Sequence, residues 1–218
     1  MEPLNTPTYV RLREQIREDI AEGVWALGSH VTLAQMVKRY EVSANPVREA
    51  LLQLQGEGII DMQMHRGAVI PRVDASYIAN IYDLRGAIEQ MLAARVATIA
   101  TPADVDAIEE ARARHEAAAR AHDIREAVLA NREFHRAFNR VAANQPALDV
   151  LSSRSSLVDA LRRSIGYGER RLDMVVSQHK KLVAAVRKGD AVAASKAALE
   201  HAESARTDLL KRLADVNK

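Results

Sequence analysis

Three histidines lie on the apolar faces of three different predicted helices. His135, His179 and His201 are each spaced three or four positions from apolar residues, so each is expected to face the interior of a helical bundle. Asn131 stands one helical turn before His135 and points to the same side. Neutral imidazoles together with an oxygen ligand suit zinc, nickel or another late divalent ion, and they leave positions open for a bound anion. The spacing therefore favours a divalent metal site.

Other interpretations of these histidines stay open. A single buried histidine is most often a hydrogen-bonded core residue, and the three could also contact a small effector directly without a metal. A helical metallohydrolase would need a base beside the metal. The chain has no Glu-x-x-His or His-Glu-x-x-His motif, phosphate-cradling glycine loop or nucleophile elbow, which indicates that it is not an enzyme. The remaining histidines are assigned to loops, a wing tip or a charged helix: His30, His65, His115 and His122.

The elements that would position these residues are helical from about residue 76 onward. Residues 71–74 mark a boundary, and no strand-like alternation follows it. Thr101, Asp123 and Asp190 are predicted to cap helices. Short connections favour an antiparallel bundle of about six helices, in a domain that covers residues 74–218. The predicted helices span 76–100, 102–122, 124–143, 146–165, 169–188 and 191 to near the C-terminus.

Residues 1–73 have a different pattern. A first helix over 8–23 is followed by a helix over 33–40, a turn, and a helix that starts near Ser43 or Asn45 with Pro46 in its first turn. Two short strands, 59–64 and 68–70, then form a two-stranded wing. A helix, a short turn and a helix is the arrangement that places its second helix in the DNA major groove. Phosphate contacts would come from Lys38, Arg39, Arg48 and Arg66.

Composition limits the class of protein. Hydrophobic residues make up 48 % of the chain and aromatic residues only 4 %, which favours closely packed helices. The chain has no cysteine, no recognisable signal peptide and no apolar run of membrane-spanning length, so we expect a cytoplasmic protein. Net charge is only +2, and residues 1–74 carry eight Lys and Arg against ten Asp and Glu. DNA binding would therefore depend on a few placed cations, which dimerisation would double.

The sequence VSANPVREALLQLQGEGII, followed by HRGAVIP, resembles the winged helix-turn-helix of GntR-type bacterial transcription regulators. The family usually has Arg-Thr where this chain has Ala44-Asn45, so the operator sequence of relatives does not transfer. The resemblance implies base or phosphate contacts from Asn45 and Arg48, and wing contacts with the minor groove or backbone. The residues expected at the DNA are Lys38, Ser43, Asn45, Pro46, Arg48, Arg66 and Gly67.

The C-terminal half resembles the effector-binding domain of the FadR-type branch of the same family. The matching segments are Asn131-x-x-x-His135, Gln178-His179 and Glu200-His201. In metal-dependent members, an Asp and three His hold a divalent metal to which a carboxylate effector binds. Asn131 stands where that Asp usually is. An amide oxygen can ligate, but it is uncharged and a weaker donor.

The resemblance also implies a role for Arg85, in the sequence YDLRGAIEQ, because relatives often present an arginine there to the effector. Arg162 and Arg163 are alternative partners for an anion. Taken together, the sequence predicts a homodimeric repressor that binds an inverted repeat in double-stranded DNA. A small organic acid would act on it through zinc or nickel held by Asn131 and the three histidines.

Overall fold

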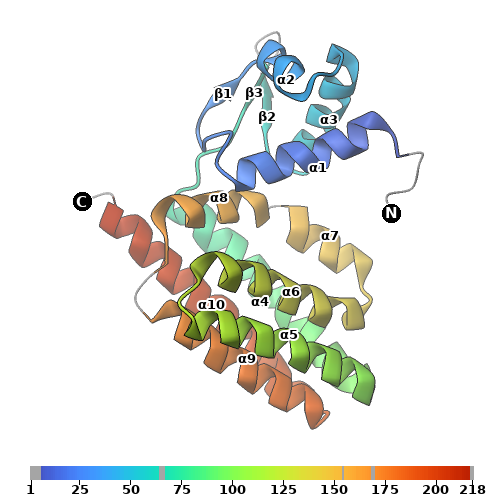
Figure 1. The fold of residues 1–218 in the computed structure, drawn as a ribbon, viewed down its shortest axis with the longest axis vertical. Helices are drawn as coiled ribbons and strands as arrows, with labels where there is room; N and C mark the ends of the chain where they lie inside the picture. The colour runs from blue at the N-terminus through green and yellow to red at the C-terminus, as the bar shows by residue number, and fades with distance from the viewer. Residues whose placement is uncertain (1–5, 64–66, 154, 168–169, 217–218) are drawn as a thin grey trace. The chain divides into compact units, whose positions relative to one another are not determined.

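The computed structural model describes residues 6–63, 67–153, 155–167 and 170–216. It is mostly α-helical with one small sheet, which confirms the predicted fold class (Figure 1). The chain forms two compact units. The N-terminal unit comprises Met1–Tyr77 and Val150–Gly166, and the C-terminal unit comprises Ile78–Asp149 and Tyr167–Lys218.

The N-terminal unit contains the predicted helix-turn-helix. Its sheet is antiparallel with the strand order β1-β3-β2, so β3 lies in the middle and pairs with both neighbours. Only two strands were predicted, because β1 is two residues long and too short to show an alternating pattern. The elements are α1 Thr8–Ala21, β1 His30–Val31, α2 Leu33–Tyr40, α3 Ala44–Gly56, β2 Asp61–Gln63 and β3 Gly67–Val69.

Helix α1 is held against α2 by a polar cluster around Asp19. Arg39 Nε donates to Asp19 Oδ2 at 2.6 Å, and the Tyr40 hydroxyl donates to the same oxygen at 2.8 Å. Trp25 Nε1 in turn donates to the Tyr40 hydroxyl at 2.8 Å. Burial raises the pKa of Tyr40, so its hydroxyl stays protonated and able to donate. The cluster fixes α2, the first helix of the helix-turn-helix, on α1.

The predicted helix over 146–165 is instead two helices, α7 (Gln145–Ser153) and α8 (Ser155–Ile165). Helix α8 belongs to the N-terminal unit, where it packs on α1 and buries Leu157 and Leu161. Arg163 Nε donates to the Ala21 carbonyl at the end of α1, at 3.1 Å. No residue of α7 is buried among those that the structure describes. Helical periodicity alone does not show that two parts of an apolar segment have different packing partners.

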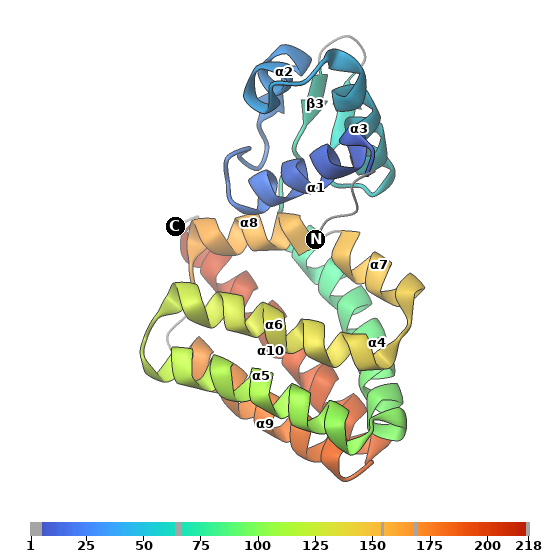
Figure 2. The same cartoon turned by 45° about the vertical axis from the view of Figure 1, so that its right-hand side comes forward.

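The C-terminal unit is built from long helices (Figures 1 and 2). Short connections join α4 to α5, α5 to α6 and α9 to α10, whereas the chain between α6 and α9 includes α7 and α8. Helix α5 packs against α6 and α9, and α9 packs against α10. The predicted caps are confirmed, since the side chains of Thr101, Asp123 and Asp190 each accept a backbone N–H three residues on. The long helices are α4 Ala75–Ile99, α5 Pro102–Arg120, α6 Ile124–Ala142, α9 Arg171–Arg187 and α10 Ala191–Val216.

The interior of the C-terminal unit combines a few large side chains with many alanines. Phe134, Ile78, Ile108 and Leu92 are almost fully buried, and alanines of α10 let neighbouring helices approach closely. Within the described residues, none of the helices is long and apolar enough to cross a membrane.

Candidate metal centre and DNA-binding surface

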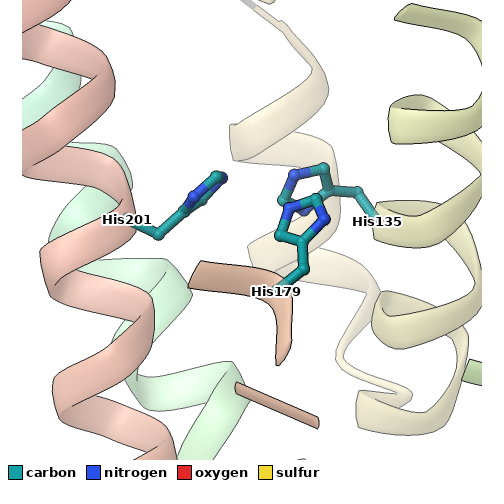
Figure 3. Close-up of side chains that lie close together, drawn as sticks. All are labelled: His135, His179 and His201. Atoms are coloured by element: carbon teal, nitrogen blue, oxygen red, sulfur yellow. The ribbon is translucent and has the colours of Figure 1, made fainter. Parts of the chain in front are cut away.

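The structure brings the three predicted histidines together. His135 comes from α6, His179 from α9 and His201 from α10, and their rings point toward one another (Figure 3). One ligand nitrogen from each lies within 4.8 Å of the others. Imidazoles bound to one ion at about 2.0–2.1 Å from the metal have nitrogens three to four ångströms apart, so small side-chain adjustments bring these rings to ligating distance.

Aromatic packing orients the central histidine. The His179 side chain is fully buried and stacks on Phe134, with ring centroids 3.9 Å apart and an angle of 22° between the planes. The His135 ring meets the His179 ring edge-on at 5.3 Å, and the His201 ring is tilted at 5.0 Å. Phe134 precedes His135 on α6, so one helix supplies both a candidate ligand and the surface that fixes another.

A hydrogen bond orients His201. Its Nδ1 lies 2.9 Å from Gln178 Oε1, which leaves Nε2 for the centre of the cluster. When this Nδ1 carries the proton, it donates to the amide oxygen. Histidines that bind metals commonly donate their other ring N–H in this way, because the bond fixes the tautomer and the ring orientation.

Burial keeps these imidazoles neutral. It lowers the pKa of His135, and it lowers the pKa of His179 and His201 well below the usual value. Neighbouring positive groups act in the same direction: the charges of Arg171 and Arg85 lower the pKa of His201 further. The neutral imidazole is the form that binds a metal ion.

Several polar atoms of the candidate ligand residues have no hydrogen-bond partner among the described residues. They are both ring nitrogens of His179 and the Oδ1 atom of Asn131, all buried. A buried acceptor or donor without a partner costs about 1–3 kcal/mol, so such groups usually have a ligand, an ion or a water. These atoms are nitrogen and oxygen donors of the kind that late divalent metals bind. The residues present therefore fit a divalent ion.

His115 was assigned to a charged helix and not to the inward-facing histidines, and the structure corrects this. Its side chain on α5 is 1 % exposed, and its ring centroid lies 5.0 Å from that of His179. Burial, followed by the effect of His135, lowers the pKa of His115 to about 4. The sequence did carry a signal: Ile108, Ala111, His115 and Ala118 follow helical spacing, and all four are buried.

Arg85 is half-buried and already engaged. Its Nη2 donates to Glu89 Oε1 at 2.8 Å, and its guanidinium lies 5.4 Å from the Tyr82 ring centroid. Its charge reaches the candidate ligands, since it lowers the pKa of both His135 and His201. An acidic ligand near the histidines would thus lie in the field of Arg85.

The predicted DNA-contacting residues of the helix-turn-helix are exposed. Asn45 and Arg48 lie three residues apart on α3, and both face solvent. Ser43 occupies the N-cap position of α3, yet its side chain makes no capping hydrogen bond. Its hydroxyl and the first N–H groups of α3 can therefore contact a phosphate. Lys38 on α2 is exposed, and Pro46 is partly exposed in the first turn of α3.

The remaining residues predicted to contact DNA are Arg39, Arg66 and Gly67. Arg39 pairs with Asp19, as described above, and its guanidinium lies 5.7 Å from the Trp25 ring centroid. Arg66 lies outside the described residues. Gly67 begins β3 with φ +104, and a Cβ there would come 2.3 Å from the Val31 carbonyl oxygen. Glycine is thus required at this position by the packing of the sheet.

Comparison with known proteins identifies the chain. The FCD domain matches residues 80–204, more than half of the sequence, and the family described as bacterial regulatory proteins, gntR family, matches residues 8–70. The chain belongs to the GntR family. This GntR regulator has the FCD type of C-terminal domain, which confirms the family resemblance, and it is a DNA-binding transcription regulator and not an enzyme.

Relatives and solved structures agree with this assignment. The HTH-type transcriptional repressor RspR of Escherichia coli K12 is 25 % identical over 200 residues, which cover 92 % of this chain and 86 % of that protein. The HTH-type transcriptional regulator YdhC of Bacillus subtilis is 24 % identical, covering 90 % of this chain and 88 % of that one. The structure of E. coli McbR/YncC has a TM-score of 0.82 at 16 % identity, covering 96 % of this chain and 100 % of that one. A GntR regulator from Rhodococcus sp. RHA1 has a TM-score of 0.73 at 20 % identity, covering 94 % and 99 %.

Proposed function

We propose that this GntR regulator is a repressor whose DNA affinity is controlled by a small organic acid that binds near a divalent metal. The observation that carries the proposal is the cluster of His135, His179 and His201 on three different helices. Neutral, converging imidazoles suit zinc or nickel, and both ring nitrogens of His179 have no partner among the described residues. Asn131 would add an amide oxygen, one helical turn before His135.

When bound, the metal would supply positive charge that attracts an anionic ligand. Asn131 leaves that charge intact, whereas an aspartate would neutralise part of it, so an acidic effector is the expected complement. Arg85 would add to this positive field, because its charge already lowers the pKa of His135 and His201. The effector carboxylate would compete with Glu89 for Arg85, because that guanidinium is already paired.

The N-terminal residues 1–73 would bind DNA, and residues 74–218 would bind effector and form a homodimer. Each protomer would take one half of an inverted repeat, with α3 in the major groove. The expected contacts are Lys38, Ser43, Asn45, Pro46 and Arg48, with Arg66 and Gly67 in the wing. The E. coli relative RspR is named a repressor, which supports the direction of control. Because the partner is DNA, we place the protein in the cytoplasm.

The first test is metal content. Untagged protein and a His179→Ala variant would be loaded with zinc or nickel, desalted and analysed by plasma mass spectrometry. About one ion per chain is expected in the parent, with most of it lost in the variant. A His122→Ala variant, which changes an exposed histidine, should keep its metal. An empty parent after loading would sink the metal centre and favour direct contact of the histidines with the effector.

The second test concerns the effector. A panel of small carboxylic acids would be screened by thermal shift on metal-loaded and chelator-treated protein. An effector that binds only the metal-loaded form should raise the melting temperature of that form alone. Arg85→Ala should reduce the shift. An acid that stabilises both forms equally would show that the metal is not part of its binding site.

A further inference from the structure

The candidate ligand His179 lacks a hydrogen-bond partner for its second ring nitrogen, whereas its neighbour His201 has one. A metal occupies one nitrogen of an imidazole, and the other N–H then needs an acceptor. For His201, Gln178 Oε1 is in place at 2.9 Å from Nδ1. For His179, neither ring nitrogen has a partner among the described residues. Phe134 covers the face of the His179 ring, so it cannot accept a hydrogen bond from a ring N–H, which points outward in the plane of the ring.

His115 has a ring nitrogen that can serve as this acceptor. Its Nδ1 is buried and lacks a partner within the described part of the chain. Its ring centroid is 5.0 Å from that of His179, with an angle of 50° between the planes. Two imidazoles joined by a linear N–H···N hydrogen bond have centroids about 5 Å apart, since each nitrogen lies about 1.1 Å from its centroid and the bond is about 2.9 Å long. Rotation of the rings, with little change in their separation, would make the bond.

The position of His115 also separates it from the ligand cluster itself. His179 has close ring contacts with His115, His135 and His201, but the ligand nitrogens that all lie within 4.8 Å of one another belong to His135, His179 and His201. His115 approaches from α5, whereas the candidate ligands come from α6, α9 and α10. Its charged neighbours on α5 are Arg112 and Glu116, which pair with each other at 2.5 Å and do not occupy its Nδ1.

We infer that His115 is a positioning residue of the metal centre: its Nδ1 accepts a hydrogen bond from the ring N–H of His179 when the other nitrogen of His179 holds the metal. This inference rests on the metal centre proposed above. The buried Nδ1 of His115 has no other partner within the described part of the chain, so with the proton on Nε2 it can accept this bond. The bond would fix both the tautomer and the orientation of the central ligand.

Zinc affinity measured by competition with a chromophoric chelator tests the inference. His115→Leu and His115→Met remove the acceptor nitrogen and fill its place with an apolar side chain of similar size. Each should still bind about one zinc ion per chain, with an affinity 10–100-fold below that of the parent. His115→Gln offers an amide oxygen as acceptor and should recover most of the loss. His122→Ala is the control for loss of a histidine and should bind zinc like the parent.

The absorption spectrum of the cobalt-loaded protein separates a positioning residue from a ligand. A positioning role leaves the set of ligand atoms unchanged, so the His115 variants should keep the parent's visible bands. Equal zinc affinity in parent, Leu and Met variants would show that His115 is only a core residue. Loss of the metal and of the cobalt bands, as expected for His179→Ala, would show that it is a ligand, which also overturns the inference. A parent protein that binds no metal would overturn both the inference and the proposed metal centre. That result differs from equal zinc affinity in the variants and from loss of the metal in the variants alone.

Discussion

At the scale of single residues, environment decides what a side chain can do. His115 and His122 lie seven positions apart on or just after the same helix, yet one is buried beside a candidate ligand and the other is exposed. Arg39 and Arg48 are both exposed, but they differ in their contacts. The guanidinium of Arg39 is bound to Asp19, whereas Arg48 faces solvent on α3. Of these two cations, Arg48 is the one that we expect to contact DNA.

Replacing Arg48 with Ala should weaken DNA binding by about 1–3 kcal/mol, since one contact to a base or phosphate is lost. The probe would be a duplex selected from a random pool with the parent protein, and affinity would be measured by fluorescence anisotropy. Metal content should stay at the parent's level. Arg114→Ala, at an exposed site on α5, is the matched loss of one positive charge. Equal weakening by both substitutions would indicate a general charge effect and remove Arg48 from the interface.

At the scale of elements, the wing sheet depends on a close approach of two strands. Gly67 at the start of β3 has φ +104, and a Cβ at this position would meet the backbone of Val31 and Thr32. A side chain there would collide with the end of β1. By contrast, a Cβ at Gly56, in the last turn of α3, would meet nothing within 4 Å.

Gly67→Ala should therefore lower the free energy of unfolding by more than about 2 kcal/mol, through backbone strain and collision. Gly56→Ala should raise it by about 0.5–1 kcal/mol, because alanine loses less chain entropy in a helix. Urea unfolding followed by circular dichroism would measure both. A Gly67→Ala protein as stable as the parent would mean that the wing strand can shift away from β1.

At the scale of the whole molecule, the C-terminal unit encloses four histidines that the unfolded chain exposes: His115, His179 and His201 are buried, and His135 is half-buried. Burial is the first cause of the lowered pKa of each of them. The interior is therefore built for uncharged imidazoles, and folding and protonation compete. This competition links the candidate metal centre to the stability of the chain.

The metal-free protein should become less stable as the pH falls from about 6.5 toward 4. In this range the unfolded chain binds protons at histidines that stay neutral in the fold, so stability rises with pH and is lost on acidification. Folding lowers the pKa of His115 from 6.5 to about 4. We expect His115 to contribute on the order of 1–3 kcal/mol to the stability that is lost on acidification, after allowance for solvent screening.

Urea midpoints of chelator-treated protein at pH 7, 6 and 5 would measure this loss. The range above pH 5 avoids Glu116, whose pKa is lowered to about 2 by Lys180 and Arg112 and whose ion pairs fail only in stronger acid. His115→Leu should lose less stability over the same range, because it has one buried titrating group fewer. A midpoint that is flat or rises between pH 7 and 5 would contradict the prediction.

The sequence by itself determined the order and type of most elements, their caps, and the family. These features are local: the capping residues, the helical spacing and the Pro46–Leu51 segment are all read within a few residues. It also placed His135, His179 and His201 on inward faces. Only the tertiary structure showed that the three converge, because convergence depends on how α6, α9 and α10 pack. Packing likewise decided that His115 joins them, that α8 lies on α1, and that the two-residue strand β1 completes the sheet.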